Sequence, residues 1–262
     1  MSTTFSNPGN YDEPAVFTAE GLIREARRQK GLPERSIPAL CVLDPDGDIL
    51  RHLRADGLAH REPYWPCYHT ELWRFDTGFG EAGLVACAVG GPYAVLIAEQ
   101  MFCCGCELLV SITSAGQVSP IADPPYFVLA EGALRDEGTS RHYLPPSRYV
   151  MLDAGHTQFA ENAVRESGLH VERGLVWTTD APFRETESAI AQARSENILA
   201  VEMETASLYA FAQKKRKPVV SFAHVTNQMG QVDGDFEKGE AWGSAASLRL
   251  IGAMAQAWRG RE

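Results

Sequence analysis

The apolar residues of the chain fall into short runs that alternate with segments of helical periodicity. The short runs predict β-strands at residues 39–43, 84–89, 108–113, 127–129, 175–179, 198–201 and 219–225. Apolar residues spaced three and four apart predict helices at residues 19–29, 94–103, 156–167, 184–194, 205–214 and 240–258. Because strands and helices alternate, the pattern predicts an α/β fold, in which helices flank a mixed, strongly twisted central sheet.

The length of the chain fits one domain with a substantial core. It has 262 residues, without an internal repeat or a compositional break that would mark a linker. We therefore expect a single domain over residues 1–262. Residues 1–36 form an N-terminal helical extension of it, whose helix ends at Gly31 and Pro33.

The charge and the hydropathy exclude several classes of partner. Asp and Glu outnumber Lys and Arg by 34 to 24, which gives a formal charge of −10. A nucleic-acid surface needs a basic face, so we expect no nucleic-acid partner. Residues 1–14 are polar and no apolar stretch approaches a bilayer span, so we expect neither a signal peptide nor a membrane anchor. These features favour a cytoplasmic location.

The six cysteines predict free thiols. Three of them cluster at Cys103, Cys104 and Cys106, at the end of a predicted helix. A structural zinc site would need a second pair of ligands, which the spacing lacks. We expect buried free thiols, no metal site and no cofactor.

Polar or glycine-rich segments follow most of the predicted strands. Carboxyl ends of neighbouring parallel strands meet at one edge of a sheet, where ligands bind in α/β proteins. Each segment alone is more often a turn or a helix cap. Their joint placement favours one active-site crevice, built from residues 44–48, 90–91, 114–116, 180–183, 202–204 and Asn227.

Glu202, Met203 and Glu204 carry the strongest chemical signal. Two carboxylates at the end of an apolar strand are costly to desolvate unless hydroxyls or cations satisfy them. A polyol such as ribose would donate its hydroxyls to the carboxylates and rest on Met203. The alternative is a helix N-terminus, where the macrodipole favours carboxylates.

The segment around these glutamates, VEMETA at residues 201–206, resembles a motif of the uridine phosphorylase and purine nucleoside phosphorylase family (nucleoside phosphorylase superfamily I). The likeness continues, in the family's order, from about Pro38 to Asn227. It includes AVGGPY at 88–93, TSAG at 113–116, DEGTSRHY at 136–143 and TTDAPF at 178–183. The resemblance implies the phosphorylase/hydrolase-like fold and cleavage of an N-glycosidic bond.

The resemblance also implies roles at the nucleoside site. Glu204 binds the ribose hydroxyls, with Glu202 and Met203 beside it, and Phe183 stacks on the base. Asn227 lies at the base-recognition position, where an asparagine hints at a 6-oxopurine. The glutamine and arginine with which uridine phosphorylases read uracil are missing after Phe183. The substrate turn is expected at Ser114, Ala115 and Gly116.

The phosphate site matches the family less well. GDILR at residues 47–51 resembles the family's GDPLR, which implies that the Gly47 amide and Arg51 bind phosphate together with Ser114. The arginine expected before the turn is replaced by Ser111. His69 lies near the position of an arginine that a neighbouring subunit usually provides. The partial positive charge of His69 could take the place of that arginine at the phosphate.

Three functions stay open. The first is a nucleoside phosphorylase, a pentosyltransferase of nucleotide salvage that releases free base and (deoxy)ribose 1-phosphate and needs inorganic phosphate as its co-substrate. The second is a nucleosidase, in which an acidic residue after the first strand activates water; Asp44, Asp46 and Asp48 lie there, and Asp48 is nearest the expected point. The third is a non-catalytic nucleoside-binding protein. For all three the family implies a homodimer or a homohexamer.

Overall fold

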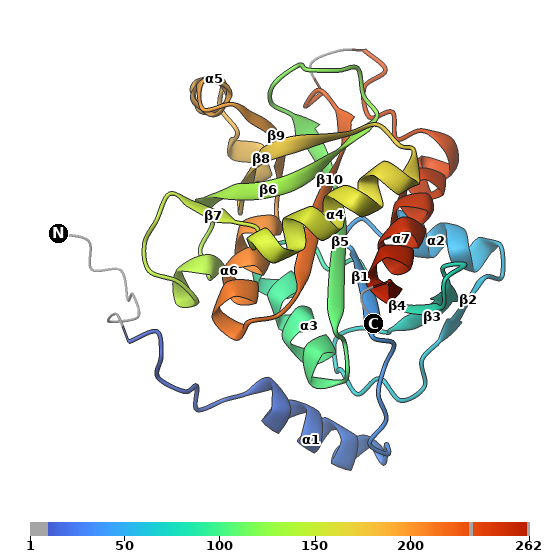
Figure 1. Ribbon diagram of the computed structural model, residues 1–262. Helices are drawn as coiled ribbons and strands as arrows, with labels where there is room; N and C mark the ends of the chain where they lie inside the picture. Colours follow the sequence, from blue (N-terminus) through green and yellow to red (C-terminus); the bar gives the residue numbers. More distant parts are fainter. Residues whose placement is uncertain (1–9, 231–232, 261–262) are drawn as a thin grey trace.

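A ten-stranded mixed sheet runs through the molecule, and helices cover both of its faces (Figure 1). The structure is a computed structural model that describes residues 10–230 and 233–260. Its strands are β1 (Leu40–Asp44), β2 (Ala59–Arg61), β3 (Trp73–Asp76), β4 (Glu81–Ala86), β5 (Leu108–Gln117), β6 (Tyr126–Asp136), β7 (Tyr149–Met151), β8 (Val171–Thr179), β9 (Ile198–Glu202) and β10 (Val219–Asn227). The predicted α/β fold with a mixed central sheet is confirmed.

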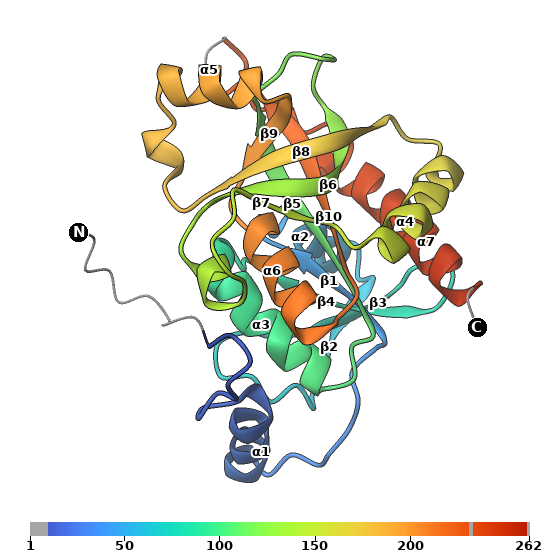
Figure 2. The ribbon, with the colours of Figure 1, turned by 60° about the vertical axis from the view of Figure 1, so that its left-hand side comes forward.

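The helices fill the connections between these strands. They are α1 (Ala19–Lys30), α2 (Asp48–Ala55), α3 (Gly91–Cys103), α4 (Ala154–Ser167), α5 (Glu187–Ser195), α6 (Thr205–Lys215) and α7 (Ser244–Arg259), with short 3-10 turns η1 (Thr139–His142), η2 (Pro182–Arg184) and η3 (Glu240–Gly243). Helices α3 and α6 pack together on one side of the sheet, and α4 and α7 pack together on the other (Figure 2).

Two groups of parallel strands run in opposite directions. Strands β4, β1, β5 and β10 are parallel to one another, and β6, β8 and β9 form a second parallel group. The groups join through the antiparallel pairs β10–β6 and β5–β9, so β5, β10, β6, β8 and β9 close on one another. As a result the carboxyl ends of β9 and β5 pair with each other, with Val201 opposite Gly116.

The structure corrects the expected substrate turn at Ser114, Ala115 and Gly116. These residues belong to β5, which continues to Gln117 and pairs with both β10 and β9. Gly116 is needed at this junction, because a Cβ there would lie 2.7 Å from Met229 Cγ. The three residues therefore belong to a strand, and their contact with a substrate stays a prediction.

Helix α2 is the main element that the hydrophobic pattern missed. Gly47, with φ of 78°, starts the helix, and only Ile49 and Leu53 are buried on it. The apolar residues Ile49, Leu50 and Leu53 extend over little more than one helical turn, which is too short for a helical period to be read. The residues that we expected in a phosphate loop, Asp48 to Arg51, form the first turn of α2.

Helix α7 begins later than predicted. The expected helix from residue 240 is interrupted at Ala241 and Trp242, whose φ angles of 51° and 58° are left-handed. The regular helix starts at Ser244. This break shapes the loop that precedes α7.

Helix α1 packs against α3 at the periphery of the molecule (Figure 2). Thr18 caps it by accepting a hydrogen bond from the Gly21 amide, and Gly31 ends it in the left-handed conformation. The helix thus has the bounds that the sequence predicted. Residues 1–9 of the expected N-terminal extension lie outside the described residues.

The cysteines are free, but not all are buried. Cys104 and Cys106 of the cluster are buried, whereas Cys103 is half-buried and Cys87 is exposed. Within residues 10–230 and 233–260, no three His, Cys, Asp or Glu side chains are grouped as a metal site would require. In the same residues no helix is long and apolar enough to cross a membrane.

Candidate active site

Glu204 lies in the interior, two residues beyond the end of β9, where that strand pairs with the carboxyl end of β5. Its side chain is 1% exposed. Oε1 accepts a hydrogen bond from the Gly90 amide at 2.6 Å, and Oε2 accepts one from Thr113 Oγ1 at 2.9 Å. Burial, aided by the nearby charge of Glu202, raises the Glu204 pKa to about 8. The carboxylate thus has few donors for its degree of burial, and additional hydroxyl donors would stabilise its charged form.

Glu202 has a structural task. Its Oε2 accepts the backbone amides of Glu204 and Thr205, both at 2.8 Å, and its Oε1 accepts the hydroxyl of Thr178. It therefore satisfies free amides at the start of α6, although burial raises its pKa. Glu202 thus binds a helix N-terminus, as the alternative interpretation expected, whereas Glu204 contacts the glycine turn before α3 and its role in ribose binding stays a prediction. Met203 is half-buried between them.

Asp46 is the acidic residue that reaches β5. Its Oδ2 accepts a hydrogen bond from the Ser114 amide at 2.7 Å. Ser114 follows Thr113, the partner of Glu204, and the charge of Asp46 contributes to the raised Glu204 pKa. The two carboxylates therefore belong to one site, and Asp46 occupies the amide that we expected to bind phosphate.

Asp48 is neutralised by two cations. Arg51 donates to its Oδ1, and Lys238 Nζ lies 2.5 Å from its Oδ2. The Arg51 side chain is 65% exposed, whereas that of Lys238 is 20% exposed. Both oxygens of Asp48 thus have a cationic partner.

Asp44 holds the backbone of this segment. Its two oxygens accept the amides of Gly47 and Leu50, both at 3.0 Å, and burial raises its pKa to about 7. The Gly47 amide, which we expected to bind phosphate, is bound within the chain. Phosphate binding by Gly47 stays a prediction that requires the amide to change partner.

A polar cavity of about 20 Å³ lies between these carboxylates and the start of α7. His224 lines it, with its ring stacked on Phe127 at 4.3 Å between centroids. Burial lowers the His224 pKa to about 4, and the charge of Lys238 adds to the effect. Ser244 Oγ is buried there and has no hydrogen-bond partner among the described residues. The volume suits one water molecule with polar partners.

The remaining predicted residues lie at the margins of this arrangement. Phe183 is 99% exposed on η2, so its stacking role stays a prediction. Asn227 ends β10; its Nδ2 contacts the Ala115 carbonyl at 3.3 Å, and its Oδ1 accepts the Met229 amide at 2.9 Å. His69 is exposed, and its carbonyl accepts the Tyr93 hydroxyl at the start of α3.

Comparison with known proteins identifies the family of the chain. Residues 40–256 match the family model described as "Phosphorylase superfamily". The chain belongs to the phosphorylase superfamily.

The relatives within the superfamily are distant. An uncharacterized protein of Acanthamoeba polyphaga mimivirus is 29% identical over 153 residues, which cover 58% of this chain and 57% of that protein. A guanosine phosphorylase of Halorubrum lacusprofundi is 25% identical over 48% of this chain and 53% of its own length. A uridine phosphorylase of Thermococcus kodakarensis is 24% identical over 63% and 69%. The match thus spans little more than half of the first two relatives.

Solved structures of the superfamily share the fold. The crystal structure of a uridine phosphorylase from Vibrio fischeri superposes with a TM-score of 0.72 at 16% identity, covering 88% of this chain and 99% of that one. A second structure of uridine phosphorylase from that organism gives a TM-score of 0.69 at 19% identity.

Sequence reasoning assigned no role to Lys238 or to the hydroxyl of Thr113, two groups that contact the carboxylates described above. Thr113 is the first residue of the TSAG motif, so the motif could have identified it as a site residue. Lys238 is 190 residues from Asp48 and in no motif. Only the folded chain brings it to the acidic segment.

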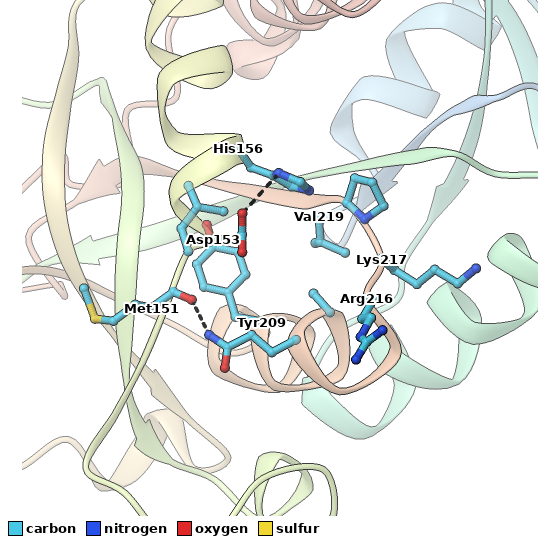
Figure 3. A pocket seen from close by; sticks show the side chains of 11 residues that line it. Met151, Asp153, His156, Tyr209, Arg216, Lys217 and Val219 are labelled. Carbon is cyan, nitrogen blue, oxygen red and sulfur yellow. Dashed lines mark hydrogen bonds and ion pairs between the residues drawn. The ribbon is translucent and has the colours of Figure 1, made fainter.

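A larger pocket of about 220 Å³ lies at the start of β10, the strand end opposite to Asn227 (Figure 3). Tyr209, Val219, Asp153 and His156 line it, and Gln213 Nε2 donates to the Met151 carbonyl beside it. The Lys217 side chain extends away from it in Figure 3. It contains none of the predicted site residues.

Proposed function

We propose that the protein is a nucleoside phosphorylase, which transfers the pentose of a nucleoside to inorganic phosphate and releases the free base. The observation that carries this proposal is the buried Glu204 carboxylate, held by only Gly90 and Thr113 at the junction of β9 and β5. The distant relatives named as guanosine, uridine and purine nucleoside phosphorylases support it.

Glu204 suits the sugar half of this reaction. Cleavage of the N-glycosidic bond builds positive charge on the sugar ring, and a fixed carboxylate near the ring stabilises that charge. Ribose hydroxyls that donate to Glu204 supply the hydrogen bonds that the ionised carboxylate lacks, and so lower its pKa from about 8. Substrate binding and ionisation of Glu204 thus favour each other.

The base half of the site rests on fewer residues. Phe183, fully exposed on η2, is free to cover a bound base, whereas the Asn227 side chain would exchange its contacts with Ala115 and Met229 for the base. Asn227 and the similarity to a guanosine phosphorylase favour a 6-oxopurine. We further propose a homodimer, in which the partner subunit covers the exposed Phe183 and His69.

Product analysis tests the reaction. The protein is incubated with purine and pyrimidine nucleosides, as ribo- and deoxyribo-forms, in phosphate buffer and in phosphate-free buffer. Phosphorolysis gives pentose 1-phosphate only when phosphate is present. Free pentose as the sole sugar product in phosphate would contradict the proposal, and binding without turnover in either buffer would favour a nucleoside-binding protein.

Hydrolysis is the second candidate, because Asp46 reaches the site. Its carboxylate holds the Ser114 amide and lines the water-sized cavity, whereas Asp48, the residue that we expected to activate water, is paired with two cations. If water is the nucleophile, Asp46 is the better general base. Asp46→Asn would then abolish release of free pentose, and Asp48→Asn would retain it.

A further inference from the structure

The loop between β10 and α7 brings a lysine to the acidic segment after β1. Lys238 Nζ lies 2.5 Å from Asp48 Oδ2 and 3.8 Å from Asp46 Oδ1. Its side chain is largely buried, at 20% exposure. The ammonium group therefore sits between the carboxylate that holds the Ser114 amide and the one that holds Arg51.

Close packing holds the backbone at Lys238. A Cβ on Gly243 would lie 2.4 Å from His224 Cε1 and 2.8 Å from the Lys238 carbonyl, so this approach depends on glycine. Earlier in the loop, the Asp235 carboxylate accepts the amides of Gln228 and Gly230. Lys238 is thus positioned beside the end of β10 by its surroundings.

Cations are scarce around the site. Strand β5, which contributes Thr113 and Ser114, carries no Lys or Arg between Leu108 and Gln117. Two carboxylates, Asp46 and Asp48, are balanced by Arg51 and Lys238. An anion that enters beside Ser114 therefore approaches cations that are already paired with Asp48.

We propose that Lys238 is one of the cations that bind phosphate: it leaves Asp48 and binds the phosphate co-substrate, in addition to Arg51, which the motif at residues 47–51 predicts as a phosphate ligand. This inference rests on the phosphorolytic function proposed above. A lysine suits the exchange, because its ammonium is a point charge on a flexible stem that needs no fixed planar partner. Lys238 is also the less exposed of the two cations, so its interactions are screened less by salt.

Steady-state kinetics of Lys238→Met and Lys238→Arg test the assignment. We expect Lys238→Met to raise the KM for phosphate by about tenfold or more, the value of one charged hydrogen bond, and to leave the nucleoside KM within about twofold. Lys238→Arg should retain most of the phosphate affinity. Lys214→Met, which removes a surface lysine paired with Asp12, is the matched control and should change neither KM.

The double variant Lys238→Met/Asp48→Asn separates phosphate binding from neutralisation of Asp48. If Lys238 only neutralises Asp48, removing that carboxylate restores the phosphate KM and overturns the proposal. If Lys238 binds phosphate, the double variant stays impaired. Isothermal titration calorimetry of each protein with inorganic phosphate alone measures the phosphate Kd without turnover.

The failures of the two proposals are distinguishable. A wild-type protein whose turnover does not depend on phosphate overturns both proposals. A wild-type protein that forms pentose 1-phosphate, with a phosphate KM unchanged in Lys238→Met, overturns the assignment of Lys238 alone. An equal rise in both KM values also overturns it, because that pattern indicates a displaced loop.

Discussion

Two acidic segments of the protein, residues 202–204 and residues 44–48, satisfy their carboxylates in different ways. Glu202 and Glu204 are bound by backbone amides and hydroxyls, without a cation. Asp48 is bound by Arg51 and Lys238, and Asp46 is shared between the Ser114 amide and Lys238. The neutral donors of Glu204 do not offset its burial, so its pKa is raised and further donors would stabilise its charged form. Cations stabilise the charge of the second segment. The first arrangement suits hydroxyl binding, and the second can exchange a cation with an anion.

The largest effect is expected at Glu204. Glu204→Gln keeps an oxygen for the Gly90 amide and an amide that donates to Thr113 Oγ1, so the fold should persist. Loss of charged hydrogen bonds to the sugar should lower kcat/KM for the nucleoside by about 30-fold or more, which is about 2 kcal/mol. Kinetics at saturating phosphate measure this, with Glu196→Gln at the exposed Arg148 ion pair as the control. An unchanged kcat/KM would remove the sugar-site assignment.

The effect of pH on kcat/KM through ionisation of Glu204 should be nearly as large. Because the Glu204 pKa is raised to about 8 and the ionised form is active, kcat/KM should rise with pH and level off above about 8. Below that pH the fall should approach tenfold per unit. The measurement uses a constant concentration of phosphate dianion. Glu204→Gln should lose this dependence, and a wild-type profile that is flat from pH 6 to 9 would contradict it.

A stability change should distinguish Glu202 from Glu204. Glu202→Gln loses an oxygen that accepts two amides or the Thr178 hydroxyl, and should lower the free energy of unfolding by about 1–2 kcal/mol. Glu204→Gln should be near neutral, since the raised pKa means that the fold already disfavours its charge. Urea unfolding at pH 7 measures both. Equal losses would show that both glutamates are structural.

The smallest effect is expected for Asp46→Asn. If phosphate is the nucleophile, removing a carboxylate that competes for Ser114 and Lys238 should lower the phosphate KM by about two- to fivefold, since like charge repels the dianion. A loss of about 100-fold in turnover would instead identify Asp46 as a general base for water. Asp123→Asn, in the segment between β5 and β6, is the control variant.

Most of the fold was predictable because its strands and helices bury continuous apolar stretches. Strand β10 is buried at every position, and α6 buries Thr205 to Phe211, so both are clear in the hydrophobic pattern. Helix α2 and the strands β2 and β3 are too short to give such a pattern. Ser114 to Gly116 stay inside β5 because the strand pairs there with two distant strands, and local sequence does not encode that pairing.

By itself the sequence determined the α/β class and the superfamily motif with its two glutamates, because these depend on local patterns and on residues that are adjacent in the chain. The tertiary structure decided how the carboxylates are used. Asp46 accepts the Ser114 amide, whereas Asp48 pairs with Arg51 in the first turn of α2 and with Lys238 in the loop before α7. Arg51 is three residues from Asp48, but Ser114 is 68 residues from Asp46 and Lys238 is 190 residues from Asp48. Charge pairing of this kind follows distance in space, and not position along the chain.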